Sequence, residues 1–477
     1  MASGARWHHW PMQKGTPERT GYSPHVMPNI SKSEAWTWQA EILDIHRATP
    51  LIDDQLNVYV TSIAGRSVKF SPDGKKLWSH YTGVERGGVP GVPVIEGDRL
   101  LMLSTFGFLI SIDLETGAEV WSRKVTQMSD STTDCLLATQ GVVVLSAMDP
   151  VVSTLAAGRT QRWNHENNRV LGLSVSDGSV VFKFAPYTTV YNFQASTQHD
   201  GSFVFQDVTG AVYRVTLEGK LVWYGGAIDP KSASTAAAVI SEGKVYAVCN
   251  VGGGMKEGMS EGKGHLHAYD YVTGRKLWWQ ELPYEGNQAV AVGQLPGAKG
   301  LSLVMGMGKN PGIPWFMLVA KILPSWMVPW TYPIYALTLR YPHWFAWPQN
   351  RAILAFDAET GDLQWWHELP AYQKLASEGD NEKFLERYQG WTNNPNNEPV
   401  CMPDANSQPV IDGAGTAFVP FQDGHVYAVR DANGDGKISP DEVQSHHVGD
   451  AFQASLAMAP KMLVALDCQG RLKVFKD

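Results

Sequence analysis

The sequence predicts an all-β protein, an eight-bladed β-propeller built as one domain over residues 1–477. Three observations predict it: a recurring strand–turn–strand motif, an interval of about 40 residues between most copies of the motif, and an N-terminal strand able to complete the last blade. Hydrophobic residues make up 44 % of the chain, so a core of this size can be filled.

The recurring motif is a strand, an acidic turn that ends in Gly, and a Trp four residues after the Gly. Its copies read "SPDGKKLW", "DLETGAEVW", "TLEGKLVW", "DYVTGRKLWW" and "DAETGDLQWW", with the aromatic residue at Trp78, Trp121, Trp223, Trp278 and Trp365. A divergent copy, "SVSDGSVVF", has Phe182 in this position. Gly supplies the positive φ of a tight hairpin turn. The Trp then falls in the outermost strand, where it can pack against the neighbouring sheet.

Two more blades are predicted near residues 408–449 and 451–477. The last one has no residues left for an outermost strand. The N-terminal "EAWTWQAEI" can supply that strand, with Trp36 or Trp38 in the expected position. We therefore expect the N-terminal strand to join the C-terminal blade and close the ring, which removes exposed strand edges.

This repeat, together with the opening "HWPMQKGTPERTGYSP", resembles the pyrroloquinoline-quinone (PQQ) repeat superfamily. The resemblance extends from about Trp10 to the C-terminus. The superfamily includes quinoprotein alcohol dehydrogenases and also non-catalytic propellers, such as the scaffold lipoprotein of bacterial outer-membrane protein assembly. The resemblance therefore implies the fold and leaves the function open.

The long insertions are predicted to share one face. If the strands of a blade are named A to D from the channel outward, the B–C and D–A connections lie on one face of the ring. The long connections are residues 149–168, 250–265, 308–350 and 370–407, and all four are of these two kinds. Because loops on a rigid scaffold commonly carry function, we expect this face to bind partners.

The most unusual insertion is the aromatic one in blade six, "IPWFMLVAKILPSWMVPWTYPIYALTLRYPHWFAW". Pro324, Pro329 and Pro333 disfavour a regular transmembrane helix. Three interpretations stay open: a lid on the propeller, a docking surface (residues 313–347) for a protein partner or a membrane-associated assembly, or the wall of an apolar pocket. The candidate partner-binding residues are Trp315, Phe316, Trp326, Trp330, Tyr332, Tyr335, Trp344 and Trp347.

The insertion at 370–407 is predicted to be a short helix followed by a loop. Ser377 or Asp380 is expected to cap the helix, and Gly390 to end it. The Asn and Asp residues of the following "NNPNNEPVCMPDANSQP" are expected to be turn formers.

Residues 431–442, "DANGDGKISPDE", match an EF-hand calcium loop. The ligand positions are Asp431, Asn433, Asp435, Lys437 through its carbonyl, Ser439 and Glu442. The strand "GHVYAVR" precedes the loop, so we expect it to replace the hairpin turn between strands C and D of blade seven. Its predicted role is structural, because a calcium sensor needs a pair of helices.

The favoured function is a non-catalytic scaffold with a structural calcium ion. No catalytic residues are predicted. The alternative is a PQQ-dependent dehydrogenase of alcohols or sugars; the resemblance implies PQQ and calcium in the channel, and a disulfide between adjacent cysteines. None of the four cysteines is adjacent to another, and PQQ is not favoured. The net charge of −8 argues against a nucleic-acid partner.

The compartment is left open by the sequence. Cys401 and Cys468 can pair only if their segments are neighbours. The N-terminal residues have no apolar segment typical of a secretory signal. The expected location is therefore cytoplasmic or organellar, or alternatively periplasmic or exported after removal of a leader.

Overall fold

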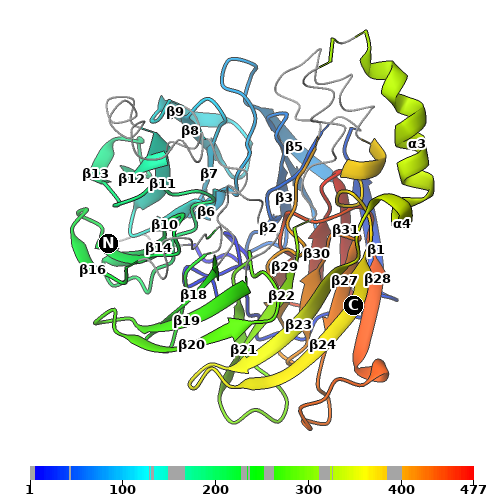
Figure 1. Ribbon diagram of the computed structural model, residues 1–477. Coiled ribbons are helices and arrows are strands. Elements are labelled where there is room, and N and C mark those ends of the chain that lie inside the picture. Colours follow the sequence, from blue (N-terminus) through cyan, green and yellow to red (C-terminus); the bar gives the residue numbers. More distant parts are fainter. Residues whose placement is uncertain are drawn as a thin grey trace.

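The computed structural model has eight antiparallel sheets arranged in a ring, so the predicted eight-bladed propeller is confirmed (Figure 1). The structure describes residues 6–41, 44–127, 129, 134–148, 167–226, 234, 237–251, 263–310, 323–324, 326–383 and 400–477.

The strands of each blade follow one another from the channel outward. Blade one is β2 (Leu51–Ile52), β3 (Val58–Thr61), β4 (Arg66–Phe70) and β5 (Lys76–Tyr81); blade two is β6 (Val94–Glu96), β7 (Arg99–Leu103), β8 (Phe108–Asp113) and β9 (Glu119–Lys124); blade three is β10 (Leu137–Thr139), β11 (Val142–Met148), β12 (Asn167–Ser174) and β13 (Val180–Phe184). Blade four is β14 (Ser202–Gln206), β15 (Val212–Thr216) and β16 (Leu221–Tyr224), with a bridge from Ser196 to Val204 in place of the inner strand.

The second half of the ring continues in the same order. Blade five is β17 (Val239–Ser241), β18 (Lys244–Val251), β19 (Lys263–Asp270) and β20 (Lys276–Leu282); blade six is β21 (Ala291–Gln294), β22 (Leu301–Gly308), β23 (Gln349–Asp357) and β24 (Leu363–Tyr372). Blade seven is β25 (Val410–Ile411), β26 (Ala417–Pro420), β27 (His425–Val429) and β28 (Val443–His447); blade eight is β29 (Ala457–Ala459), β30 (Met462–Leu466), β31 (Arg471–Lys476) and β1 (Glu34–Gln39).

Burial follows the position of a strand in its blade. The inner and middle strands are packed on both sides and read as nearly continuous apolar runs, as in β7 and β30. The outer strands β5 and β9 have mostly exposed and half-buried residues. The core is therefore a series of layers between neighbouring blades.

The motif Trp and the motif Gly meet between blades. A Cβ atom added to Gly117 of blade two would lie 2.7 Å from the indole of Trp78 in blade one. The same contact recurs between Gly178 and Trp121, and between Gly274 and Trp223. Each Gly also has a positive φ, at 72° for Gly117. Each motif position therefore requires Gly for two reasons: the turn needs a positive φ, and the indole leaves no space for a Cβ atom.

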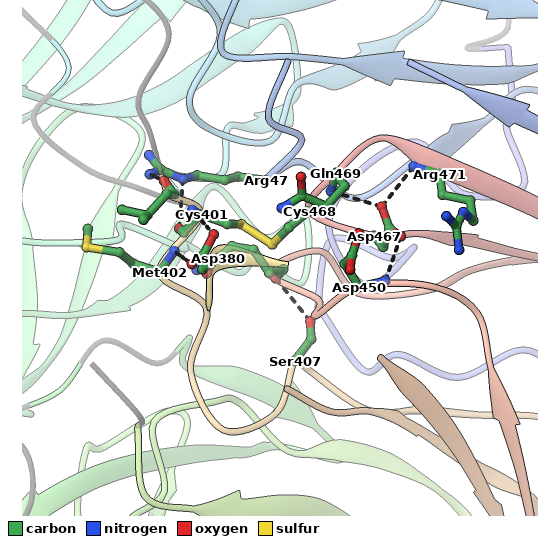
Figure 2. Close-up of a disulfide and its surroundings, with 12 residues drawn as sticks. Arg47, Asp380, Cys401, Met402, Ser407, Asp450, Asp467, Cys468, Gln469 and Arg471 are labelled. Atoms are coloured by element: carbon green, nitrogen blue, oxygen red, sulfur yellow. Dashed lines mark hydrogen bonds between the residues drawn. A yellow bond between two sulfur atoms is a disulfide. The ribbon is translucent and has the colours of Figure 1, made fainter. Parts of the chain in front are cut away.

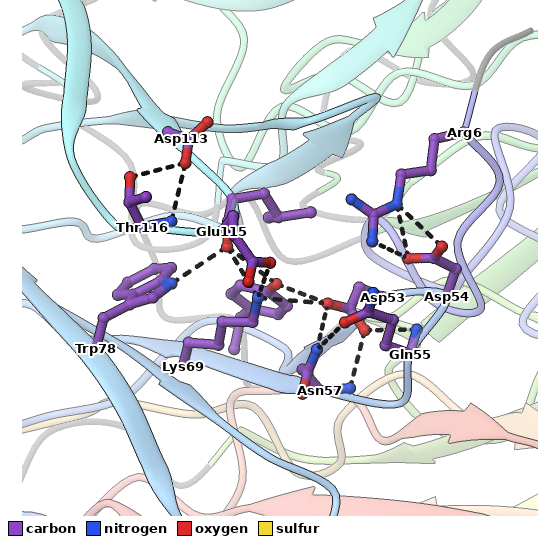
Figure 3. Close-up of polar contacts among 12 residues, drawn as sticks. Arg6, Asp53, Asp54, Gln55, Asn57, Lys69, Trp78, Asp113, Glu115 and Thr116 are labelled. Atoms are coloured by element: carbon purple, nitrogen blue, oxygen red, sulfur yellow. Dashed lines mark hydrogen bonds and ion pairs between the residues drawn. The ribbon is translucent and has the colours of Figure 1, made fainter.

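Hydrogen bonds fix the indole to the same turn (Figure 3). The Trp78 Nε1 donates to the carbonyl of Leu114 at 3.2 Å, and the Lys69 ammonium donates to the same carbonyl at 3.0 Å. Lys69 also lies 3.9 Å from Asp53, which accepts bonds from Asn57 in the turn before β3. Two neighbouring blades are thus joined through one turn.

The same contact closes the ring. β1 pairs antiparallel with β31 beside it (Figure 1), which confirms the predicted closure. The Trp36 indole lies on Gly74 of blade one and donates to the Pro72 carbonyl at 2.9 Å, so Trp36 rather than Trp38 occupies the motif position. In the divergent repeat, the Phe182 ring lies against Gly219 in the same way.

The segment 10–23 crosses one end of the channel, a role that no pattern in the sequence predicts. Its backbone bonds to the inner strands or their flanks in six blades, through Ile52, Ile95, Thr197, Ile240, Val292 and Ile411. These bonds lie toward the A–B turns, on the face opposite the insertions. The segment thus ties the blades together from inside the ring.

Two basic residues of this segment are completely buried. Arg19 donates to the carbonyls of Ala195 and Leu136, and Lys14 donates to the carbonyl of Val290. Both residues have a positive φ. Burial, followed by the nearby Arg19, lowers the pKa of Lys14 well below its ordinary value.

The Gly–Trp contact predicts a specific stability difference. In Gly117→Ala, the new methyl group crowds Trp78, and the alanine must also adopt a strained left-handed backbone conformation. Gly141→Ala causes the backbone strain alone, because Gly141 has a φ of 77° and open space around its Cβ position. We expect Gly117→Ala to lower the free energy of unfolding by about 1–3 kcal/mol more than Gly141→Ala, measured by urea denaturation. Equal losses would contradict this expectation, and in a Trp78→Ala background the difference should shrink.

Candidate functional site

The B–C and D–A connections lie on one face of the ring, which we call the insertion face. The insertion in blade six connects β22 to β23, and residues 373–409 connect β24 to β25. Residues 370–372, predicted to start this second insertion, belong to β24. The two other predicted insertions fall mostly on residues 149–166 and 252–262, outside the described residues.

The described part of the aromatic insertion is helical: η2 (Val328–Thr331), α3 (Tyr332–Arg340) and α4 (Pro342–Phe345). Figure 1 shows α3 and α4 at the outer margin of the molecule. Trp326, Trp330, Trp344 and Trp347 are exposed by 71, 78, 69 and 89 % of their surface. We call these four residues the indole surface.

The other candidate partner-binding residues are placed differently. Tyr335 is buried on the inner side of α3, with 3 % of its surface exposed. Tyr332 begins α3, and its side chain lies outside what the structure describes, as do Trp315 and Phe316 entirely. A lid or a pocket wall would have its aromatic side chains covered. The exposure of the indole surface therefore favours a docking surface.

The helical part of the insertion lies beside the second insertion. Tyr335 and Thr338 are buried residues of α3, and burial, followed by the nearby Glu382 carboxylate, raises the pKa of Tyr335. After α4, the Ala346 carbonyl accepts a hydrogen bond from Gln373 Nε2, just past the end of β24, at 3.1 Å. One side of the helices is therefore covered, while the indoles are exposed.

The second insertion is tied down by a disulfide and a buried carboxylate (Figure 2). Cys401 is bonded to Cys468 in the B–C turn of blade eight, which settles the pairing that the sequence left open. The Asp380 carboxylate accepts the backbone N–H groups of Cys401 at 2.6 Å and Met402 at 2.7 Å. Asp380 thus holds the loop. Helical structure begins at Asp380, and the predicted end at Gly390 lies outside the described residues.

Asp404, expected to be a turn former, has another role, and that expectation is wrong for it. It is buried, and its carboxylate accepts bonds from Gln288 Nε2 at 2.6 Å and Asn310 Nδ2 at 2.8 Å. Burial raises its pKa to about 6. The residue links three connections of the insertion face, and no local sequence signal distinguishes it from the Asx residues around it.

The middle of the channel is occupied by side chains. Gln408 Nε2 donates a hydrogen bond to Gln194 Oε1 at 2.7 Å. Gln408 precedes the inner strand of blade seven, and Gln194 precedes the innermost bridge of blade four. Thr49 bonds to Gln13 of the N-terminal segment and accepts a bond from the Ser455 backbone at 2.9 Å. The one disulfide among the described residues joins distant cysteines rather than adjacent ones. These contacts connect the inner strands of opposite blades with the N-terminal segment.

Residues 431–442 form the connection between β27 and β28, so they do occupy the predicted C–D position. Asp431 accepts the backbone N–H groups of Gly434, Asp435 and Gly436. Glu442, eleven residues on, accepts those of Ala432 and Ser439. These bonds curl the loop around its first and last acidic residues.

The loop also packs against blade six. Gly434 lies against Gly297 in the A–B turn of that blade. Ile438 packs against the cluster that contains Trp365 of blade six. Among the residues with defined positions, no group of three His, Cys, Asp or Glu side chains is arranged to hold a metal ion.

The eight four-stranded or three-stranded sheets and their Gly–Trp contacts define a PQQ-type eight-bladed propeller. The family model described as outer membrane protein assembly factor BamB matches residues 64–253 and 208–472. The matches extend over most of the sequence, and the chain belongs to this family. No curated protein sequence matches the chain at a significant level.

Solved structures share the fold at low identity. BamB from Moraxella catarrhalis is 14 % identical with a TM-score of 0.58, over 93 % of this chain and 99 % of that one. Quinohemoprotein alcohol dehydrogenase from Comamonas testosteroni is 12 % identical with a TM-score of 0.60, over 100 % of this chain and 81 % of that one. The computationally designed Ika8 protein is 12 % identical with a TM-score of 0.58, over 93 % and 100 %. These similarities show the fold alone.

In the parts of the chain with described structure, no helix has the length and apolar character needed to cross a bilayer.

The disulfide gives a second stability prediction. Replacing Cys401 and Cys468 by Ser should lower the free energy of unfolding by about 2–4 kcal/mol, because the cross-link closes a long loop in the unfolded chain. The thermal midpoint of the parent should fall in reductant, and that of the variant should not respond. The matched control replaces the buried free thiols Cys135 and Cys249 by Ala and should keep the response to reductant. A parent that does not respond to reductant would contradict the prediction.

Proposed function

We propose that this protein is a non-catalytic scaffold of a membrane-associated assembly and that it binds its protein partners through the insertion face. The observation that carries the proposal is the indole surface, whose four Trp side chains are exposed within one insertion of the ring. Exposed aromatic area gathered in one segment of a folded protein typically marks an interaction site. The family description, an outer membrane protein assembly factor, supports the same role.

The construction of the ring suits a scaffold. Its blades are joined by the Gly–Trp contacts, its edges are closed by β1, and its channel is crossed by residues 10–23. A rigid body of this kind holds several loops in fixed relative positions, which is what simultaneous binding of partners requires.

We further propose that the protein works in an oxidising compartment outside the cytoplasm. The support is the buried disulfide between Cys401 and Cys468. Disulfides persist in exported proteins and are rare in the cytosol, where thiols are kept reduced. This location agrees with a role in an outer-membrane assembly.

We also propose that residues 431–442 bind a structural calcium ion. The spacing of oxygen ligands and the curled backbone support it, and Glu442, at the twelfth position, is half-buried. Hydrogen bonds from Ser439 lower the pKa of Glu442, so its carboxylate is ionised at neutral pH. A bound ion would tie the β27–β28 connection that lacks the Gly–Trp contact.

The scaffold proposal predicts face-specific cross-linking. A photoreactive residue placed at Lys309, Glu382 or His447 lies on the insertion face, and one at Lys220, Arg275 or Glu359 lies at the C–D turns of the other face. We expect discrete cross-links to the same membrane-associated proteins from the first set and none from the second. Products are identified by mass spectrometry after irradiation in native membranes. Equal labelling from both faces, or none, would reject the proposal.

The calcium proposal predicts a gain of stability on ion binding. At a free calcium concentration 100 times the dissociation constant, the free energy of unfolding should rise by about 2.7 kcal/mol. Glu442→Gln should remove most of this gain, because a bidentate carboxylate is lost. Asp441→Asn is the control, since Asp441 is not a ligand position, and it should keep the gain. Calorimetric titration that shows no binding in the unaltered protein would exclude the site.

A further inference from the structure

We infer that the indole surface binds the interfacial region of a bilayer that contains anionic lipid, with α3 lying along the membrane. This inference deepens the proposed function, on which it rests, by naming what the aromatic insertion contacts. It requires no protein partner, so the two ideas can be tested apart.

The exposed side chains are of a kind that suits a membrane interface. All four members of the indole surface are Trp, and each has more than two thirds of its area accessible. Indole combines a large apolar ring with one N–H donor, and for this reason Trp concentrates at membrane–water interfaces. Ile334 and Leu337 on the outer side of α3 add exposed aliphatic area next to them.

The helix α3 is oriented to lie along a surface. Tyr335 and Thr338, three residues apart, share the buried side of α3, whereas Ile334 and Leu337 are about half exposed. α3 has nine residues, which is far too short to span a bilayer. A helix fixed to the protein on one side and apolar on the other can lie in the plane of an interface.

The charge of the insertion differs from that of the whole chain. The protein carries 47 acidic residues and a net charge of −8, yet residues 313–350 contain no Asp or Glu. The charged residues in this range are Lys321 and Arg340, and Arg340 is exposed next to the indole surface. The nearby Glu382 carboxylate belongs to the second insertion, lies toward the buried Tyr335 and is paired with Lys374 at 2.9 Å. The insertion itself therefore adds no negative charge that would repel anionic headgroups, and Arg340 adds attraction.

The surroundings of the indole surface favour lipid over a protein occupant. Protein interfaces usually surround an apolar centre with a polar rim that makes about one hydrogen bond per 100–200 Å². Among the described residues of the helices beside the indole surface, the exposed side chains with titratable groups are Arg340 and His343, both cationic when charged. Such a composition suits a surface of phosphate and glycerol groups over hydrocarbon.

The test is flotation of the purified full-length protein with vesicles. We expect it to float with phosphatidylcholine vesicles containing phosphatidylglycerol, and less with phosphatidylcholine alone. Combined Trp330→Ser, Trp344→Ser and Trp347→Ser should reduce the partition coefficient by about tenfold or more, since three indoles lose their burial. Trp7→Ser is the matched control: Trp7 is 66 % exposed on the opposite face, and its replacement should change nothing.

The Arg340→Gln variant measures the electrostatic contribution to vesicle binding. It should reduce binding to the anionic vesicles by about fivefold and leave binding to phosphatidylcholine unchanged. Quenching of tryptophan fluorescence by brominated lipid in the unaltered protein is a second readout that does not depend on a variant folding. Failure of the unaltered protein to float or to be quenched would overturn the inference, as would equal flotation of the triple variant. If the lipid inference failed in this way, cross-linking from Lys309, Glu382 and His447 would remain an independent test of the proposed scaffold function.

Discussion

The contact between an indole and a glycine of the next blade is the interaction on which the rest of this structure depends. Apart from the chain itself and the disulfide between Cys401 and Cys468, no covalent bond among the described residues joins the blades, so the rigidity of the ring comes mainly from packing between neighbouring blades. In this ring the Trp of one outer strand lies on the turn of the next blade, and Gly117 leaves no room for a Cβ beneath Trp78. Because Trp36 makes the same contact on Gly74, the ring is closed by the interaction that builds it.

Blade seven shows what happens where this contact is missing. Its C–D connection is the loop 431–442, and Ile438 packs in the same cluster as Trp365. Gly434 meets Gly297 at another turn of blade six. The loop thus contacts blade six at two places instead of through a single Gly–Trp contact. These contacts give a physical reason for a long, internally hydrogen-bonded turn at this position, whether or not an ion is bound.

The repeats, the blade number and the closure could be predicted from the sequence because each motif is local: an acidic turn, a Gly and a Trp at fixed spacing. The N-terminal segment could not be assigned its place, because the bonds of residues 10–23 go to backbone groups in six blades and leave no periodic pattern. The pairing of Cys401 with Cys468, and the bonds of Asp404 to Gln288 and Asn310, likewise depend on segments brought together only by the ring.

The aromatic insertion marks the limit of sequence reasoning for the candidate site. A run of apolar residues has the same composition whether protein, lipid or water lies against it, so lid, docking surface and pocket wall were all consistent with the sequence. The distinction rests on which side chains of the helices are covered. Tyr335 of α3 is buried, whereas Trp330 and Trp344 are exposed, so the described helices have one covered side and an exposed aromatic side. In a protein held rigid by its blade contacts, such a surface lowers solubility unless another phase or partner covers it.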